Sequence, residues 1–205
     1  MKKIIIISSI IAIVLSSILF FYFKNNDKNY GESLQYLKNI DNYTCSADIV
    51  IKNDKQEIKH KGKQFYDKNL GYRMELNEKR VFLYNDSKIF VKDIGNNIKY
   101  DTDKDFDKIY KLTFISEYIS LLYTNEEIKV DNVDINDTAY EVIKTIIPGN
   151  NRNTSRAELY VSKKEHIPYK LIIFDNKNRQ SVNVMYKNFK PNVSQNKDLF
   201  NPNKL

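Results

Sequence analysis

The segment FDKIYKLTFISEYISLLY, which runs from Phe106 to Tyr123, is the one long helix-like stretch in a chain whose other patterns predict strands. On a helical wheel its apolar side chains point nearly all round, and from Thr113 onward no direction is free of them. A helix of this kind must be covered on most of its sides. About six strand-like segments precede it and four or five follow it. We therefore expect it to fill the hollow of a curved antiparallel sheet; an amphipathic helix on the face of a β-sandwich is the alternative.

The fold class that follows from this pattern is α+β. We expect a curved antiparallel sheet, an incomplete β-barrel of about 10–11 strands, wrapped around the helix and preceded by an N-terminal transmembrane helix. The side chains expected to fill the concavity all lie on the central helix and are aromatic or aliphatic: Phe106, Ile109, Phe114, Ile115, Tyr118, Ile119 and Leu122.

The chain opens with two lysines and an uncharged run, Ile4–Phe23, which as a helix would be about 30 Å long and would match the hydrocarbon core of a bilayer. The far end of this run is bulky and aromatic, which suits an interfacial anchor better than a cleavage site. We expect an uncleaved signal anchor; a signal peptide cut within Val14–Ser17 is the alternative. Because a short basic N-terminus normally stays in the cytoplasm, the folded domain would face the extracytoplasmic side.

The predicted organisation has three parts: a membrane anchor over residues 1–24, a polar linker over 25–31 and one folded domain over 32–205. Glu32–Ile40 predicts a short helix that closes one end of the sheet. Short turns predict antiparallel pairing of sequence neighbours. The strands predicted from period-two patterns are Tyr43–Asn53, Gln56–Tyr66, Tyr72–Leu76, Arg80–Tyr84, Lys88–Asp93, Asn97–Asp101, Glu127–Val130, Tyr140–Ile147, Arg156–Ser162, Tyr169–Asp175 and Ser181–Phe189.

Three further segments carry expectations of their own. Val81–Tyr84 is apolar on both faces of its strand, which indicates that the outer surface of the sheet is partly covered. Pro148–Ser155 is a long polar loop, and such a loop can carry a contact surface. The chain ends in a tail whose Leu199-Phe200 pair is expected to fold back onto the sheet.

The charge of the chain is positive but scattered. The sequence has 33 Lys and Arg against 26 Asp and Glu, a net charge of +7, which would favour anionic lipid, nucleic acid or wall polymers. In the densest basic run, Lys59, Lys61 and Lys63 would share one face of a strand, and we interpret that face as solvated. No interleaved aromatics or recognition helix indicate a nucleic-acid partner, so none is predicted.

No residue pattern marks a catalytic or metal-binding centre. His60 and His166 stand far apart, outside any metal-spaced cluster, and are interpreted as surface or partly buried strand residues. The acidic run Asp101–Asp107 lacks the glycine and the final glutamate of a calcium loop, and carboxylates near a helix start are stabilised by the helix dipole. Cys45 is expected to be a buried small hydrophobe. We therefore predict a protein without enzymatic activity, cofactor or metal.

The order of these segments resembles the LolA-like lipoprotein-carrier fold. The resemblance covers nearly all of residues 32–202 as a pattern of strands and turns, and its most specific part is Leu159–Phe189. Within that fold the chain is similar to the GerS-like germination proteins of clostridia. The matching pieces are LKNIDNYTCSADIV (Leu37–Val50), YNDSKIFV (Tyr84–Val91), LYVSKKEHIPYKLIIFDNKNRQSVNVMYKNF (Leu159–Phe189) and KDLFNP (Lys197–Pro202).

The resemblance implies a non-enzymatic protein of sporulation or germination. Such a protein would bind and activate a cell-wall N-acetylmuramoyl-L-alanine amidase for spore cortex modification, in the space between the forespore and mother-cell membranes. The best-known member is a lipoprotein, whereas this chain has no cysteine at the end of its apolar run. A transmembrane anchor would serve the same purpose.

Two other functions stay open. The first is a lipid or lipoprotein carrier that uses the concavity as its pocket, which requires the central helix to swing out. The second is an envelope sensor, which is disfavoured because its cytoplasmic part would be only Met1–Lys3. The sequence indicates neither the partner surface nor the oligomeric state.

Overall fold

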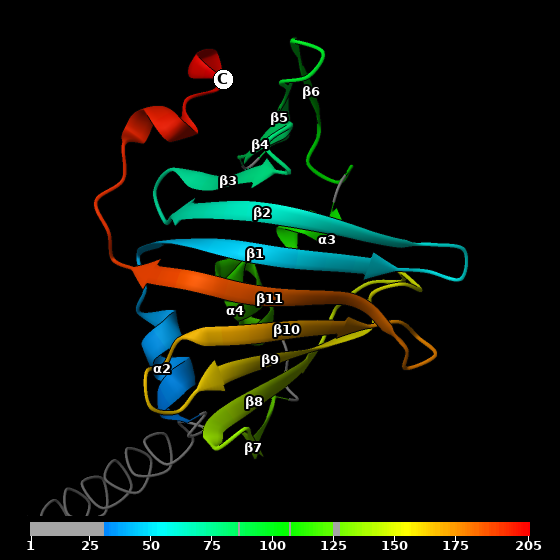
Figure 1. Cartoon of the computed structure of the whole chain (residues 1–205), viewed down its shortest axis with the longest axis vertical. Coiled ribbons are helices and arrows are strands. Elements are labelled where there is room, and N and C mark those ends of the chain that lie inside the picture. The colour runs from blue at the N-terminus through cyan, green and yellow to red at the C-terminus, as the bar shows by residue number, and fades with distance from the viewer. Residues whose placement is uncertain (1–30, 86, 107, 125–127) are drawn as a thin grey trace, which may run out of the picture. The chain divides into compact units, whose positions relative to one another are not determined.

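The structure, a computed structural model, describes residues 31–85, 87–106, 108–124 and 128–205. In this part of the chain eleven strands form one antiparallel sheet that does not close, in the order β6-β5-β4-β3-β2-β1-β11-β10-β9-β8-β7 (Figure 1). The predicted antiparallel sheet is therefore confirmed. The strands are β1 Asn42–Lys52, β2 Glu57–Asp67, β3 Gly71–Leu76, β4 Arg80–Tyr84, β5 Lys88–Asp93, β6 Ile98–Asp103, β7 Lys129–Ile135, β8 Thr138–Ile146, β9 Arg156–Ser162, β10 Pro168–Phe174 and β11 Gln180–Pro191.

The predicted anchor and linker, residues 1–24 and 25–31, lie outside the described residues except for Gly31. Residues Gly31–Leu205 form one compact unit. Among the residues that the structure describes, no helix is both long and apolar enough to cross a bilayer.

The sheet consists of two meanders that meet at its centre. Sequence neighbours pair antiparallel within each meander, as predicted, and the first strand β1 pairs with the last strand β11, with Ala47 opposite Tyr186. This central pairing places the two ends of the connection 104–128 at opposite edges of the sheet, on β6 and on β7. The connection must therefore cross one whole face of the sheet.

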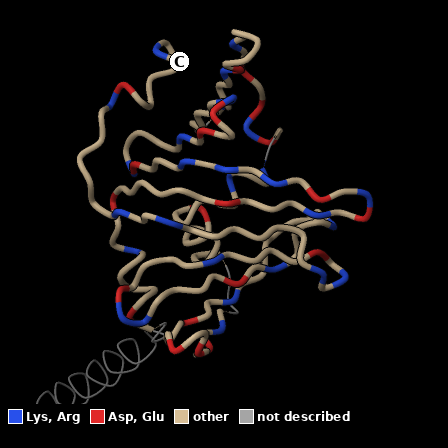
Figure 2. The backbone as a smooth tube through the Cα atoms, viewed as in Figure 1, with Lys and Arg blue, Asp and Glu red and all other residues tan. Residues whose placement is uncertain are grey.

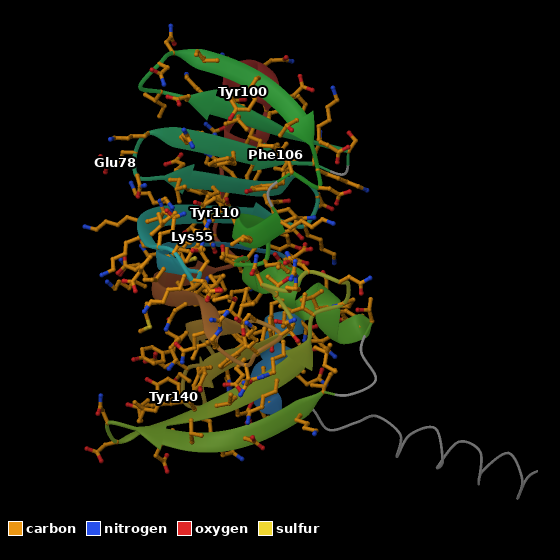
Figure 3. The ribbon with its side chains drawn as sticks, turned by 90° about the vertical axis from the view of Figure 1, so that its right-hand side faces the viewer. Lys55, Glu78, Tyr100, Phe106, Tyr110 and Tyr140 are labelled. Carbon is orange, nitrogen blue, oxygen red and sulfur yellow. The ribbon has the colours of Figure 1, made fainter. Side chains whose placement is uncertain are left out.

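The helices of that connection are α3, Lys108–Lys111, and α4, Ile115–Tyr123. We call Lys108–Tyr123 the helical insert. Both helices lie behind the sheet in Figure 1, and the turned view in Figure 3 places them along the same side of the strands. The prediction of one long helix over Phe106–Tyr123 is wrong, because the chain bends between Lys111 and Ile115.

The bend has a tertiary cause. The Thr113 carbonyl, free of a helical partner, accepts hydrogen bonds from Tyr186 Oη at 2.6 Å and Gln64 Nε2 at 3.2 Å. Phe114 is extended, with φ −78° and ψ 135°, and its ring turns toward Tyr72. Helix α4 buries four side chains, whereas Ile109 and Tyr110 of α3 are half-buried. The apolar residues of two short helices separated by a bend produce the all-round apolar pattern that the sequence shows.

The sheet curves around the insert. Strands from β4 to β8 contact the insert: the Tyr84 ring lies 6.1 Å from the Phe114 ring, and Tyr118 Oη donates to the Ile143 carbonyl at 2.6 Å. Seven strand steps separate β4 from β8, which in a flat sheet would be about 34 Å at about 4.8 Å per step. Phe114 and Tyr118 are only four positions apart in the sequence. They can contact β4 and β8 respectively only because the sheet bends.

Helix α2, Glu32–Lys38, closes one end of this core with Leu34 and Leu37 buried. Strand β7 is longer than predicted, since it runs to Ile135 and the turn is only Asn136-Asp137, both with positive φ. Its charged residues resemble a turn in the sequence, but an edge strand carries exposed charges readily.

The tail covers part of the outer, convex face, as the two apolar faces of β4 predicted. It forms two short 3₁₀ helices, η1 Lys197–Phe200 and η2 Pro202–Lys204. Leu205 is buried against Val81 and Leu83, with Phe90 packed beside them. The Leu199 carbonyl accepts from the Arg73 guanidinium at 2.8 Å, while Leu199 and Phe200 themselves stay half-buried. The tail folds back onto the sheet as predicted, but the side chain that it buries is Leu205 and not the predicted pair Leu199-Phe200.

Candidate functional site

The structure divides the residues predicted to fill the concavity into two groups. Phe114, Ile115, Tyr118, Ile119 and Leu122 are buried in the insert. Ile109 is only half-buried. Phe106 is 74% exposed in the turn before α3, so it does not fill the concavity. The physical reason is the bend at Thr113, which gives the first half of the segment a different direction from α4.

Buried hydroxyl groups bind the insert to the sheet. Besides the bonds to Thr113 and from Tyr118, Tyr43 Oη accepts from the Ile115 backbone N–H at 2.9 Å. Burial raises the pKa values of Tyr43 and Tyr186 well above the ordinary value, and burial also raises that of Tyr118. These hydroxyls therefore stay protonated, and each buried hydrogen bond resists separation of the insert from the strands.

A row of aromatic rings continues from the core toward the solvent. Neighbouring ring centroids lie 4.9–5.4 Å apart from Phe189 through Tyr43 and Tyr66 to Tyr72, and the Tyr72 ring meets Phe114 edge-on at 5.1 Å. Such contacts stabilise beyond simple burial of area. The row joins β11, β1, β2 and β3 to the start of α4.

Helix α3 is held by a histidine. Asn77 Oδ1 accepts from the Lys61 backbone N–H at 2.8 Å, so its amide nitrogen faces His60 Nδ1, also at 2.8 Å. Since Nδ1 must then accept, the hydrogen-bond network places the ring proton on Nε2, 2.8 Å from Tyr110 Oη. Burial, and then nearby Arg80, lower the pKa of His60. This contact requires a neutral imidazole.

Glu117 lies at the solvent side of the insert. Its carboxylate accepts from Tyr72 Oη at 3.3 Å and pairs with Lys111 Nζ at 3.4 Å. Burial and the Glu117 charge raise the pKa of Tyr72. Beside this carboxylate a cleft of about 570 Å³ opens between the insert and the loop after β8.

The walls of that cleft combine apolar and charged groups. Leu112 and Leu121 come from the insert, and Ile147 and Pro148 from the β8–β9 loop. The lining lysines are Lys104, Lys108 and Lys111, and two of them pair with lining carboxylates, Lys108 with Asp105 at 2.8 Å and Lys111 with Glu117 at 3.4 Å. The predicted contact loop Pro148–Ser155 thus forms one wall of an amphipathic cleft, which suits a ligand with an apolar part.

A serine–histidine contact occurs at the start of α2 but is not arranged for catalysis. Ser33 Oγ lies 3.2 Å from His166 Nδ1, while the Glu141 carboxylate accepts from the Ser33 backbone N–H at 3.2 Å instead of orienting the histidine. Ser33 is fully buried. The cluster holds α2 against β8 and the β9–β10 turn. His166 lies in that turn with φ +55°, not in a strand as expected.

Cys45 is buried, as predicted, and burial raises the pKa of its thiol. Its Sγ donates to Gln64 Oε1 at 3.5 Å. Among the described residues, no group of three or more His, Cys, Asp or Glu side chains is placed to hold a metal ion.

Exposed apolar side chains gather at one edge of the sheet. Ile98 is 53% and Tyr100 46% exposed on β6, Ile94 precedes that strand, and Phe106 follows it. Tyr100 and Phe106 appear in the same outer part of the molecule in Figure 3. We call these four residues the β6 edge patch. The opposite edge differs in its apolar side chains, because Val130, Val133 and Ile135 on β7 are half-buried.

Positively and negatively charged residues are scattered along the strands of the sheet (Figure 2), and several pairs between them lie on the convex face. Lys187 pairs with Asp48, Lys144 with Asp131 and Arg156 with Glu158. Lys59, Lys61 and Lys63 are exposed there, as predicted for a solvated face.

The open sheet with its bonded insert defines a curved antiparallel-sheet fold that wraps a helical insert. The chain belongs to the family of YdcC-like sporulation proteins, whose model matches residues 1–200. The comparison with curated proteins finds no match.

Solved structures share the fold. An uncharacterized conserved protein from Thermus thermophilus has a TM-score of 0.52 and 8% identity, covering 82% of this chain and 88% of that chain. The complex of the CwlD amidase with the GerS lipoprotein from Clostridioides difficile has a TM-score of 0.47 and 22% identity, with 80% and 95% covered. The LolA superfamily protein NE2245 from Nitrosomonas europaea has a TM-score of 0.43 and 12% identity, with 84% and 97% covered. The predicted resemblance is confirmed to the extent that a GerS structure and a LolA superfamily structure are among the similar solved structures.

Sequence reasoning missed several residues that organise the site. Gln64 and Tyr186 hold Thr113, and His60 holds Tyr110. A glutamine or histidine on the apolar face of a strand is the signal that would have marked two of them, because a buried polar side chain needs a partner.

Proposed function

We propose that this protein is a non-enzymatic binding module that docks and activates a cell-wall N-acetylmuramoyl-L-alanine amidase during spore cortex modification. Membership in a sporulation family supports the setting. The partner class comes from the sequence resemblance to the GerS-like proteins. The apolar run Ile4–Phe23 supports attachment to the membrane, with the domain on the extracytoplasmic side.

One observation carries the choice of docking over carriage: the concave face is filled by the insert and bonded to it. A carrier must empty that space, which would break the bonds of Tyr186, Tyr118 and Tyr43 to the insert. Each buried donor or acceptor left without a partner costs about 1–3 kcal/mol. A docking protein needs no such opening, because it works through its outer surfaces.

The β6 edge patch is the surface that we assign to the amidase. Large exposed aromatic side chains make strong interface anchors. The other edge, β7, offers fewer anchors, because its apolar residues Val130, Val133 and Ile135 are half-buried.

The test is co-purification of the tagged full-length chain with the amidases of sporulating cells. We expect the native chain to retain an amidase, and Tyr100→Ser and Phe106→Ser to weaken retention about tenfold or more. Tyr123→Ser is the matched control, since Tyr123 is 70% exposed at the end of α4, outside the patch. Recovery of no amidase by the native chain would overturn the proposal.

A second function is favoured by the amphipathic cleft beside Glu117. A lipid or lipoprotein chain could enter between Leu121 and Ile147. Mass spectrometry of lipids extracted from the purified full-length chain separates the two functions. Stoichiometric lipid that is lost in Leu121→Arg would support carriage, and a lipid-free protein would support docking.

A further inference from the structure

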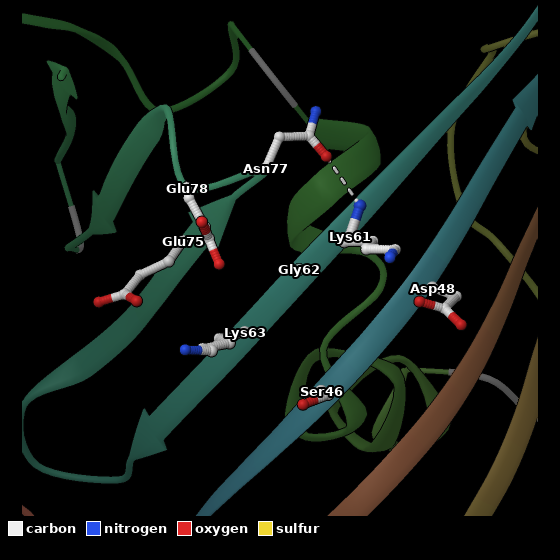
Figure 4. A pocket seen from close by; sticks show the side chains of 8 residues that line it. All are labelled: Ser46, Asp48, Lys61, Gly62, Lys63, Glu75, Asn77 and Glu78. Atoms are coloured by element: carbon white, nitrogen blue, oxygen red, sulfur yellow. Dashed lines mark hydrogen bonds between the residues drawn. The ribbon is translucent and has the colours of Figure 1, made fainter. Parts of the chain in front are cut away.

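A hollow of about 480 Å³ lies on the convex face, on the opposite side of the sheet from the insert (Figure 4). Ser46 and Asp48 line it from β1, Lys61 and Lys63 from β2, and Glu75 and Glu78 from the end of β3 and the turn that follows. Its volume falls within the range of small-ligand sites, but its lining is polar, so it selects a charged ligand.

Two of the carboxylates in the hollow are already neutralised. Asp48 pairs with Lys187 Nζ at 2.5 Å, and Glu75 pairs with the Arg73 guanidinium at 2.7 Å. Both partners lie outside the hollow. The charges that face a ligand are therefore those of the remaining lining residues.

Those remaining charges are Lys61, Lys63 and Glu78. In the part of the chain that the structure describes, none of the three forms an ion pair, and neither lysine side chain forms a hydrogen bond. The neighbouring Lys59 on the same strand face does pair, with Glu57 at 3.2 Å. The hollow thus presents two lysines and one glutamate that form no ion pair with one another.

The walls of the hollow are held in place. Lys61 and Lys63 lie on β2 between two paired strands, β1 and β3. The turn is fixed by Asn77, which accepts from the Lys61 backbone N–H and contacts His60. Glu78 follows it with φ +58°. The backbone positions from which Lys61, Lys63 and Glu78 extend are therefore set by the sheet and the turn.

We propose that this hollow binds a short peptide that carries both free carboxylates and a free amine, and that the peptide of the cell wall is its ligand. The carboxylates would lie against Lys61 and Lys63, with the Ser46 hydroxyl beside them, and the amine against Glu78. A simple anion would leave Glu78 unpaired, and a simple cation would leave both lysines unpaired. Only a ligand with both charges matches all three groups.

The identity of the ligand rests on the proposed function. An N-acetylmuramoyl-L-alanine amidase adds water across the amide between muramic acid and L-alanine, which leaves a carboxylate on the sugar and a new α-amine on the peptide. The released peptide carries that amine together with its own carboxylates. A docking protein with this hollow would hold the product of its partner.

The test is calorimetric titration of the full-length chain, in a neutral detergent, with the tripeptide L-alanyl-γ-D-glutamyl-L-lysine. We expect saturable binding that weakens about two- to fivefold for each of Lys61→Ala, Lys63→Ala and Glu78→Gln, which is the range for partly exposed ion pairs. Lys99→Ala, an exposed lysine on β6, is the matched control and should leave binding unchanged. Acetylating only the alanine α-amine, with the lysine ε-amine left free, should weaken binding to the native chain but not further weaken it in Glu78→Gln.

A second peptide and a second readout separate the possible failures. If L-alanyl-L-glutamyl-L-lysine, with ordinary linkages, binds equally well, the assignment to the wall peptide is overturned. No binding of either peptide, or unchanged binding in the lysine variants, overturns the site. Amidase retention is measured on the same variants; if the native chain binds the wall tripeptide yet retains no amidase, the proposed function fails while the site stands.

Discussion

The two faces of the sheet are built on different physical principles. The concave face is closed by buried aromatic rings and by hydroxyl groups that bond to the insert. The convex face is held by exposed ion pairs between neighbouring strands, and only near β4 does the tail bury apolar side chains on it. Stability is therefore concentrated on the concave face, while the convex face and the edges are available for binding.

The largest expected effect comes from removing a ring at the bend of the insert. Phe114→Ala should lower the free energy of unfolding by about 3–5 kcal/mol, because Phe114 is fully buried between the insert and β3 and β4. Urea unfolding of the full-length chain in detergent measures it. Phe106→Ala is the control and should change stability by less than about 0.5 kcal/mol. Equal effects of the two substitutions would mean that the insert is not packed as described.

The next effect tests the covered part of the convex face. Leu205→Ala should cost about 2 kcal/mol, the low end for a buried leucine, because the neighbouring Asn203 and Lys204 are exposed and can relax around the lost side chain. Its partners are Val81, Leu83 and Phe90. Lys204→Ala removes only an exposed ion pair with Asp198 and should cost less. A Leu205 variant as stable as the native chain would show that the tail does not cover β4 in solution.

A smaller effect is expected from removing a single interaction, a hydrogen bond on the concave face or an ion pair on the convex face. Tyr118→Phe removes the bond to the Ile143 carbonyl and should cost about 1 kcal/mol. Lys187→Met removes the exposed pair with Asp48 and should cost only a few tenths of a kcal/mol. Thermal unfolding of both variants under the same conditions measures the difference. The reverse order of the two costs would contradict the contrast between the faces.

The smallest effect depends on pH. The pKa of His60 is lower in the folded chain than its ordinary value of about 6.5. The unfolded chain therefore binds the proton more readily, so this contribution to stability is present above pH 6.5 and is lost as pH falls through the folded pKa. Stability measured at pH 7.5 and 5.5 should fall less in His60→Gln than in the native chain. The same fall in both would exclude His60 as the titrating group.

The features that could be predicted from the sequence are those that depend on a local pattern of apolar and turn residues. The bounds of β4, β5 and β9 agree with the predicted strands, because the short runs Arg80–Tyr84, Lys88–Asp93 and Arg156–Ser162 are rich in β-branched, aromatic and aliphatic residues and are bounded by turn residues. The burial of Phe114 to Leu122 also follows from an apolar surface that needs cover.

The missed features depend on residues far apart in the chain. The break of the helix at Thr113 requires Tyr186 and Gln64, which lie on other strands. The hollow on the convex face requires β1, β2 and the turn after β3 to be side by side. Strand β7 was shortened because Asp134 resembles a turn residue, whereas at a sheet edge it faces solvent. No local pattern records these tertiary relations.

Hydrogen exchange of the full-length chain, alone and with its amidase, tests the central claim most directly. If the protein acts through its outer surfaces while the insert stays bonded in the concavity, the amides of α4 should remain equally protected in both states, and protection should rise on β6. Loss of protection in α4 upon binding would contradict the account, because it would show that the insert leaves the sheet when the protein works.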